Sequence, residues 1–122
     1  METINVSQLG FEMGHIGINQ SDAPQAEQTA RLLATLFGFP VRDTPGSIFV
    51  NEQFEVLKKP FLGELGHISI RTVDIEKAKA YLEEKGVAFN ESTANYGPDG
   101  KLNTVYLQQE IGGFAFHLAR KA

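Results

Sequence analysis

The chain has 122 residues, of which 42% are hydrophobic and 21% charged, and this composition predicts a single globular domain over residues 1–122. Because there is no cysteine, disulfide scaffolds, cysteine-ligated zinc, iron–sulfur clusters and thiol nucleophiles are excluded, and we expect a cytoplasmic protein. The net charge is −4 and basic residues occur singly or in pairs, so nucleic acid is not an expected partner. No apolar run approaches the roughly 20 residues of a membrane span, so we expect a small-molecule substrate and no membrane partner.

A short motif occurs twice in the chain. The sequence Gly-His-Ile-Gly-Ile at residues 14–18 recurs as Gly-His-Ile-Ser-Ile at residues 66–70. Each copy precedes a helical pattern and then two or three strand-like runs. We therefore predict two βαβββ modules, at about residues 10–60 and 62–121, which are each too small to stand alone and should pack together.

The first module begins with an alternating strand at residues 15–19. Asp22 and Pro24 are typical of a helix start, apolar residues then recur at helical spacing, and Gly38 is typical of a helix end. Strands follow at residues 47–51 and 54–58, and a weaker strand signal lies at residues 41–43.

The second module repeats this order, with a strand at residues 67–71. Thr72 or Asp74 can cap the next helix, which should end at Gly86. We predict further strands at residues 87–89, 104–108 and 114–119. The segment from Asn90 to Lys101 is longer than its counterpart; it could form a lid, but Pro98-Asp99-Gly100 favours a hairpin turn at residues 97–100.

Strand alternation predicts that one face of the sheet packs under the helices and that the other is free. The free face is mixed and polar, which favours a ligand-binding cup over a second core. Its side chains are those of His15, Asn19, Phe49, Glu55, Leu57, His67, Arg71, Tyr106, Gln108 and His117.

All three histidines of the chain fall on this free face. His15 and His67 occupy equivalent positions in the repeated strands, and Glu55 in the first module aligns with His117 in the second. A single strand histidine is more often a hydrogen-bonded polar residue than a ligand, but the symmetry of the whole set favours a metal site. Three imidazoles and a carboxylate suit Zn, Ni, Co, Mn or Fe, so the cofactor we expect is a divalent metal ion.

The duplicated Gly-His-Ile starts and Glu55 resemble the vicinal oxygen chelate superfamily, which includes glyoxalase I, extradiol dioxygenases, methylmalonyl-CoA epimerase and the bleomycin and fosfomycin resistance proteins. The similarity covers about residues 10–120. It implies an α+β fold in which paired βαβββ modules form a cup-shaped mixed sheet around a divalent metal. The end of the chain, at residues 110–118, is also similar to a module fused to some 2-keto-3-deoxy-6-phosphogluconate aldolases.

The resemblance places the metal ligands at His15, Glu55, His67 and His117. Glyoxalase-like members usually have Glu where this chain has His117. The dioxygenases use two His and one Glu, but their Glu lies in the second module. The chain therefore matches neither ligand set in full.

The function we predict is that of a divalent-metal-dependent, glyoxalase-like lyase or isomerase. It would chelate a small keto acid, hydroxy acid or aldehyde through two oxygens and stabilise an enolate. Either Glu55 is both ligand and catalytic base, or a hydroxide held by the ion moves the proton. The substrate-binding candidates are Arg71, Asn19, Tyr106 and Gln108, with Arg71 suited to a carboxylate or phosphate.

Two other functions remain open at this point. The first is an Fe(II)-dependent dioxygenase, and the second is a non-catalytic small-molecule binding or resistance protein. We expect a homodimer, with the cup formed either within one chain or by exchange of modules between two.

Overall fold

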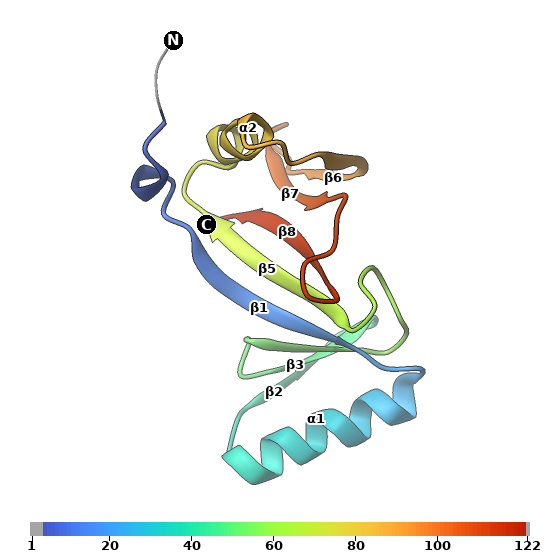
Figure 1. Ribbon diagram of the computed structural model, residues 1–122. Coiled ribbons are helices and arrows are strands. Elements are labelled where there is room, and N and C mark those ends of the chain that lie inside the picture. The colour runs from blue at the N-terminus through green and yellow to red at the C-terminus, as the bar shows by residue number, and fades with distance from the viewer. Residues whose placement is uncertain (1–3, 122) are drawn as a thin grey trace.

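Two βαβββ modules share one mixed sheet of eight strands in the computed structural model, which describes residues 4–121 (Figure 1). The elements in chain order are η1 (Val6–Leu9), β1 (Glu12–Asn19), α1 (Ala23–Phe37), β2 (Val41–Asp43), β3 (Ser47–Val50), β4 (Phe54–Leu57), β5 (Gly66–Thr72), α2 (Ile75–Glu84), β6 (Phe89–Tyr96), β7 (Leu102–Leu107) and β8 (Phe114–Arg120). The strand order is β2-β3-β4-β1-β5-β8-β7-β6. The α+β architecture predicted from the repeat is confirmed.

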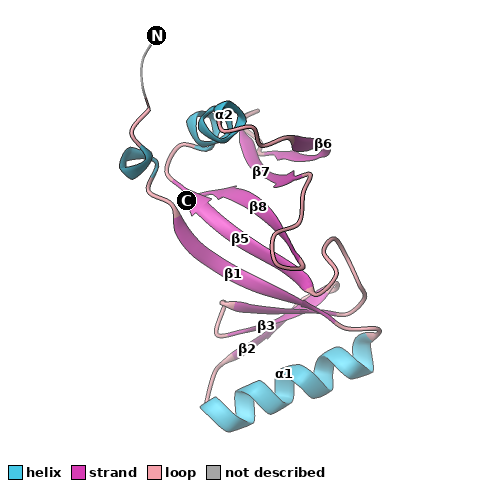
Figure 2. Cartoon of the chain, in the orientation of Figure 1, coloured by secondary structure: helices cyan, strands magenta, loops and turns pink. Residues whose placement is uncertain are grey.

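The two modules join at the centre of the sheet, where β1 and β5 pair in antiparallel orientation. Each of these strands has the last strand of its own module as its other neighbour, β4 beside β1 and β8 beside β5, and both of these pairs are parallel. The two helices lie at opposite ends of the curved sheet (Figure 2). The repeated first strands are therefore neighbours, and the cup-forming strands all come from one chain.

Helix α1 begins and ends at the residues that the sequence indicates. The carboxylate of Asp22 accepts a hydrogen bond from the backbone N–H of Gln25 at 2.9 Å, and Pro24 lies in the first turn. Gly38 ends the helix with a φ of 70°, a left-handed conformation that glycine adopts without a steric penalty. Ala26 and Ala30 are small enough to bring the helix close to the sheet, and both are buried.

Helix α2 is capped by Asp74, which accepts a hydrogen bond from the backbone N–H of Lys77 at 3.1 Å. Thr72, the other cap candidate, instead donates its hydroxyl hydrogen bond to the carbonyl of Leu9 at 2.6 Å. That contact fixes η1 against the start of α2. Neither α1 nor α2, within residues 4–121, has the length and apolar character needed to cross a membrane.

Each helix covers its own hydrophobic core on one face of the sheet. The buried residues of the first core are Ala26, Ala30, Ile48, Val50 and Val56. Those of the second core are Leu9, Ile75, Ala78, Phe89, Leu102, Val105 and Leu118. Leu9 precedes the expected start of the first module, yet it packs into the core of the second, because η1 lies against α2.

The strand predicted at residues 87–89 exists, but its bounds are wrong, because it runs from Phe89 to Tyr96. Residues 85–87 instead close the C-terminal end of α2, since the backbone N–H groups of Gly86 and Val87 donate to carbonyls of Glu83 and Leu82. The strand β6 starts only at Phe89, and its polar middle gave no apolar alternation to detect. The lid interpretation of residues 90–101 is also wrong: β6 and β7 form a hairpin, closed at the predicted turn by the Gly97 N–H donating to the Lys101 carbonyl at 2.9 Å.

The first core makes a testable prediction about stability. Ile48 is only 4% exposed, so Ile48→Ala should lower the free energy of unfolding by about 2–5 kcal/mol through lost burial and a cavity. Leu36 on α1 is 63% exposed, so Leu36→Ala should change the free energy of unfolding by less than about 0.5 kcal/mol. Urea unfolding of both variants measures this, and equal effects would contradict the packing of α1 on β3 and β4.

Candidate metal centre

Four side chains predicted as metal ligands converge on the face of the sheet opposite the helices. The Nε2 atoms of His15 and His67 lie 3.1 Å apart. The Oε1 atom of Glu55 lies 3.3 Å from Nε2 of His15 and 3.1 Å from Nε2 of His67. His117 completes the cluster, because one ring nitrogen from each of the three histidines lies within 4.8 Å of the others.

The strand register explains why these distant residues meet. Gly17 on β1 is opposite Glu55 on one side and His67 on the other. His15 lies two residues before Gly17 and so projects from the same face of β1. On the far side of β5, Ser69 is opposite His117, which brings the imidazole of β8 toward the same point.

Gly17 provides the space in which the His67 ring lies. A Cβ atom at residue 17 would overlap the Cε1 and Nδ1 atoms of His67, which is only 3% exposed. The ring therefore covers the bare backbone of β1, with its Nε2 directed at His15 and Glu55. Any larger residue at position 17 would force the imidazole out of the cluster.

The cluster holds a carboxylate in its ionised form. Burial raises the pKa of Glu55, but hydrogen bonds from His15, His67 and Ser47 outweigh burial and bring it well below its usual range. The charge of Glu55 is therefore stabilised by donors on both of its oxygens.

His117 is held as a neutral imidazole, which is the form that binds metal ions. Burial, reinforced by the nearby His67 and His15, lowers the pKa of His117 to about 4. Burial and the charge of Glu55 likewise raise the pKa of Tyr106 to about 12, so its phenol keeps its proton.

The residues present fit a divalent cation of the first transition row. Bonds of about 2.1 Å to nitrogen or oxygen would place neighbouring ligand atoms about 3.0–3.4 Å apart, and the separations of 3.1–3.3 Å among His15, His67 and Glu55 fall in this range. The Nδ1 atom of His67 is buried without a hydrogen-bond partner among the described residues, so only Nε2 of that ring has polar contacts. Three imidazoles and one carboxylate, without thiolate, suit Zn, Ni, Co, Mn or Fe.

Aromatic side chains form the walls beside the cluster. Phe49 meets His15 edge to face at 5.8 Å between ring centroids, and Tyr106 lies 4.8 Å from His117. The two are equivalent in the repeat, since Phe49 is opposite Glu55 and Tyr106 is opposite His117. Phe61, from the linker between the modules, packs on Tyr106 at 5.8 Å.

The predicted substrate-binding residues differ in how near they lie to the cluster, and their roles stay predictions. Tyr106 lies beside it, whereas Gln108 is exposed just beyond the end of β7. Asn19 is engaged by the linker, because its side-chain amide donates to the carbonyls of Gly63 and Phe61 and accepts from the Phe61 N–H. Arg71 is half exposed, forms an ion pair with Glu12 at 2.7 Å, and lies about 13 Å along β5 from His67.

Ser47 is a site residue that was not predicted from the sequence, and its hydroxyl donates to Oε2 of Glu55 at 2.8 Å. Ser47 is 3% exposed and lies on β3, two residues before Phe49 and so on the same face. Alternation along residues 47–51 could have placed it on the cup face. Its contact with Glu55, however, depends on the pairing of β3 with β4.

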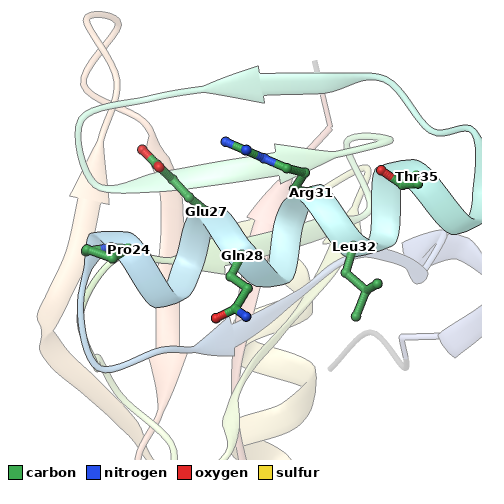
Figure 3. Close-up of a pocket in the computed structure, with 6 residues that line it drawn as sticks. All are labelled: Pro24, Glu27, Gln28, Arg31, Leu32 and Thr35. Carbon is green, nitrogen blue, oxygen red and sulfur yellow. The ribbon is translucent and has the colours of Figure 1, made fainter.

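An exposed groove elsewhere on the surface contributes nothing to this centre (Figure 3). Its lining comes entirely from α1, which packs on the other face of the sheet. The groove is formed by Pro24, Glu27, Gln28, Arg31, Leu32 and Thr35.

Comparisons with known proteins identify the fold. No family model and no curated protein matches the chain. Among solved structures, a hypothetical protein from Bacillus halodurans C-125 matches with a TM-score of 0.64 at 19% identity, over 92% of this chain and 95% of that one. A methylmalonyl-CoA epimerase from Mycobacterium tuberculosis matches with a TM-score of 0.64 at 16% identity, over 98% of this chain and 93% of that one.

A Streptomyces coelicolor methylmalonyl-CoA epimerase, solved with 2-nitronate-propionyl-CoA, matches with a TM-score of 0.63 at 19% identity, over 90% of this chain and 96% of that one. At such low identity these similarities establish the fold alone. The chain therefore shares its fold with methylmalonyl-CoA epimerases, as the resemblance implied. The closer similarity to an aldolase-fused module stays a prediction.

Gly17→Ala tests the geometry of the centre. The new methyl group would occupy the space of the His67 ring, so we expect the variant to lose most of its affinity for Co²⁺, measured by isothermal titration. Gly46→Ala is the matched control, because a Cβ there meets nothing within 4 Å. Unchanged Co²⁺ affinity in Gly17→Ala would contradict a ligand role for His67.

The neutral His117 predicts a pH dependence of stability in metal-free protein. Its pKa is about 4 when folded and about 6.5 when unfolded, so between these values the unfolded chain binds more protons and stability falls as pH falls. From pH 7 to pH 5 this single group should cost about 2 kcal/mol.

Urea unfolding of wild type and His117→Gln, with a chelator present, measures the effect. The wild type should lose about 2 kcal/mol more than the variant over this range. Parallel pH profiles for the two proteins would show that His117 does not have the lowered pKa.

Proposed function

We propose that this protein is a divalent-metal-dependent, glyoxalase-like isomerase or lyase that acts on a small substrate with two neighbouring oxygens. The observation that carries the proposal is the convergence of Nε2 of His15, Nε2 of His67 and Oε1 of Glu55, at separations of 3.1–3.3 Å suited to one cation. A ring nitrogen of His117 lies within 4.8 Å of the other two imidazoles. The preformed carboxylate–imidazole cluster has no role in either hydrophobic core. The fold shared with methylmalonyl-CoA epimerases supports the same class of chemistry.

A bound divalent cation would supply Lewis acidity toward two vicinal oxygens of the substrate and so make a C–H bond next to a carbonyl more acidic. His15, Glu55, His67 and His117 would hold the cation, and the substrate oxygens would bind it beside them. Because only Glu55 among them is charged, one positive charge of the cation stays uncompensated. This excess favours an anionic ligand such as a keto or hydroxy acid.

Glu55 is the only carboxylate of the cluster, and we assign it the proton transfer. Its Oε1 faces the imidazoles, while its Oε2 accepts one hydrogen bond from Ser47 and keeps a further lone pair free. That lone pair of Oε2 can take a proton from the substrate carbon and return it. The low pKa of Glu55 makes it a weak base, so the reaction depends on strong acidification of the substrate.

Aromatic walls on both sides would limit the access of water to the reacting group. Phe49 and Tyr106 flank the imidazoles on the two sides of the cluster, and the Tyr106 phenol stays protonated and so can donate a hydrogen bond. A dry site strengthens the electrostatic stabilisation of an enolate and protects it from stray protonation.

A second function, Fe(II)-dependent dioxygenation, is favoured by one specific feature. Nε2 of His15, Nε2 of His67 and Oε1 of Glu55 form a triangle with sides of 3.1–3.3 Å, as in the two-histidine, one-carboxylate triad of non-haem iron oxygenases. His117 is a fourth donor in the same cluster, and it would take a position that O₂ and a chelating substrate both need. We therefore rank this function second.

The test is proton exchange at the substrate carbon. Protein loaded with Zn²⁺, Co²⁺, Ni²⁺ or Mn²⁺ is mixed in D₂O with methylmalonyl-CoA or with small 2-keto acids, 2-hydroxy acids and aldehydes. Loss of the α C–H signal in proton NMR measures the reaction. Glu55→Gln should slow it by about 10²–10⁴-fold. Glu52→Gln, an exposed carboxylate in the turn before β4, is the matched control and should match wild type.

The other outcomes discriminate between the functions. Oxygen uptake by the Fe²⁺-loaded protein, without exchange in the other forms, would favour the dioxygenase. A His67→Ala variant that loses the cation but keeps its affinity for the small molecule would favour a non-catalytic binder. Elemental analysis of wild type and His15→Ala shows whether the cluster holds a metal, and unchanged metal content in His15→Ala would count against the site.

A further inference from the structure

We propose that Ser47 is a positioning residue that makes Glu55 bind the cation through a single oxygen. This inference rests on the proposed function, because it concerns the carboxylate of the same centre. The Ser47 hydroxyl donates to Oε2 at 2.8 Å, and Oε1 alone faces the Nε2 atoms of His15 and His67. The two oxygens of Glu55 therefore have different partners before any cation binds.

The β2–β3 hairpin places Ser47 where it can reach Glu55. Ser47 is opposite Leu57 on β4, and Phe49 is opposite Glu55, so the Ser47 side chain reaches Glu55 diagonally on the same face. The hairpin turn is closed by the Thr44 N–H, which donates to the Ser47 carbonyl at 2.8 Å. Lys58 braces it, since its ammonium donates to the Thr44 carbonyl at 2.7 Å.

Proton counting fixes the direction of the hydrogen bonds. A carboxylate can only accept, so the one hydroxyl proton of Ser47 goes to Glu55. The Thr44 hydroxyl lies 3.2 Å from the Ser47 hydroxyl and 2.8 Å from the Ser47 carbonyl, and it also accepts from the Ser47 N–H. Thr44 therefore holds the Ser47 residue in place without competing for the proton that Ser47 gives to Glu55.

The number of open positions on the cation follows from this contact. If Glu55 bound a six-coordinate cation through Oε1 only, the four protein ligands would take four positions and would leave two for a chelating substrate. A carboxylate released from Ser47 could turn and bind through both oxygens, which would leave one open position. Ser47 thus preserves the vacancy that two vicinal oxygens require.

The experiment measures cation binding rather than catalysis. Affinity for Co²⁺ alone is determined by competition with a chromophoric chelator for wild type, Ser47→Ala and Ser69→Ala. We expect Ser47→Ala to bind about 10- to 100-fold more weakly, as when an outer partner of a metal ligand is lost. Ser69 is the matched control, because it is a buried serine of the cup face with no side-chain hydrogen bond to Glu55 among the described residues.

A second variant keeps the proposal testable should Ser47→Ala fold poorly. Thr44→Val leaves the Ser47 hydroxyl in place but removes its brace, so affinity should fall by a smaller factor than in Ser47→Ala. The visible spectrum of the Co²⁺ form gives an independent signal, because a change in carboxylate binding mode alters the coordination number. In Ser47→Ala this spectrum should change, whereas in Ser69→Ala it should match wild type.

The outcomes separate this inference from the proposed function. Weaker Co²⁺ binding and an altered spectrum in Ser47→Ala, with wild-type values in Ser69→Ala, would support the role of Ser47. Equal affinity and spectra in wild type and Ser47→Ala would overturn it and leave the proposed centre intact. A wild type that binds no Co²⁺ would overturn the proposed function and this inference together.

Discussion

The antiparallel pairing of β1 with β5 is the constraint on which the centre depends. It sets Gly17 opposite His67, and the missing side chain at Gly17 lets a buried imidazole lie over the backbone of β1. The parallel pairing of β1 with β4 then sets Glu55 on the other side of the same glycine. Because Gly17 has no side chain, the Glu55 carboxylate and the imidazoles of His15 and His67 can lie within about hydrogen-bond distance of each other. Because buried charge is costly without partners, these contacts also keep Glu55 ionised inside the cup.

One face of the sheet carries the hydrophobic cores, and the other carries the polar cluster. Apolar side chains of both modules pack under their own helices and supply the burial that stabilises the fold. The opposite face is free to carry polar groups, and the aromatic residues Phe49 and Tyr106 pack beside the imidazoles there. The helices α1 and α2 lie at opposite ends of the sheet, so strands alone form the cup between the modules (Figure 1).

The repeat is symmetric in backbone but not in chemistry. His15 matches His67 and Phe49 matches Tyr106, whereas Glu55 matches His117. Only the first module supplies a charged ligand and a serine that holds it. A shared fold is compatible with several reactions, so the donor set and not the fold is what supports a particular reaction for this chain.

Local sequence patterns were enough to predict the duplication, both helices, most of the strands and the four residues of the cluster. These features are encoded locally, in the repeated Gly-His-Ile motif, in Asp22 and Gly38, and in the alternation that puts three histidines on one face. Only the tertiary structure decided that Ser47 reaches Glu55, that Leu9 packs in the second core and that Arg71 pairs with Glu12 away from the cluster. The polar part of β6 beyond Phe89 also escaped prediction, because an edge strand needs no apolar alternation. Each of these outcomes depends on register between strands or on contacts between segments far apart in the chain, and local sequence patterns do not encode either.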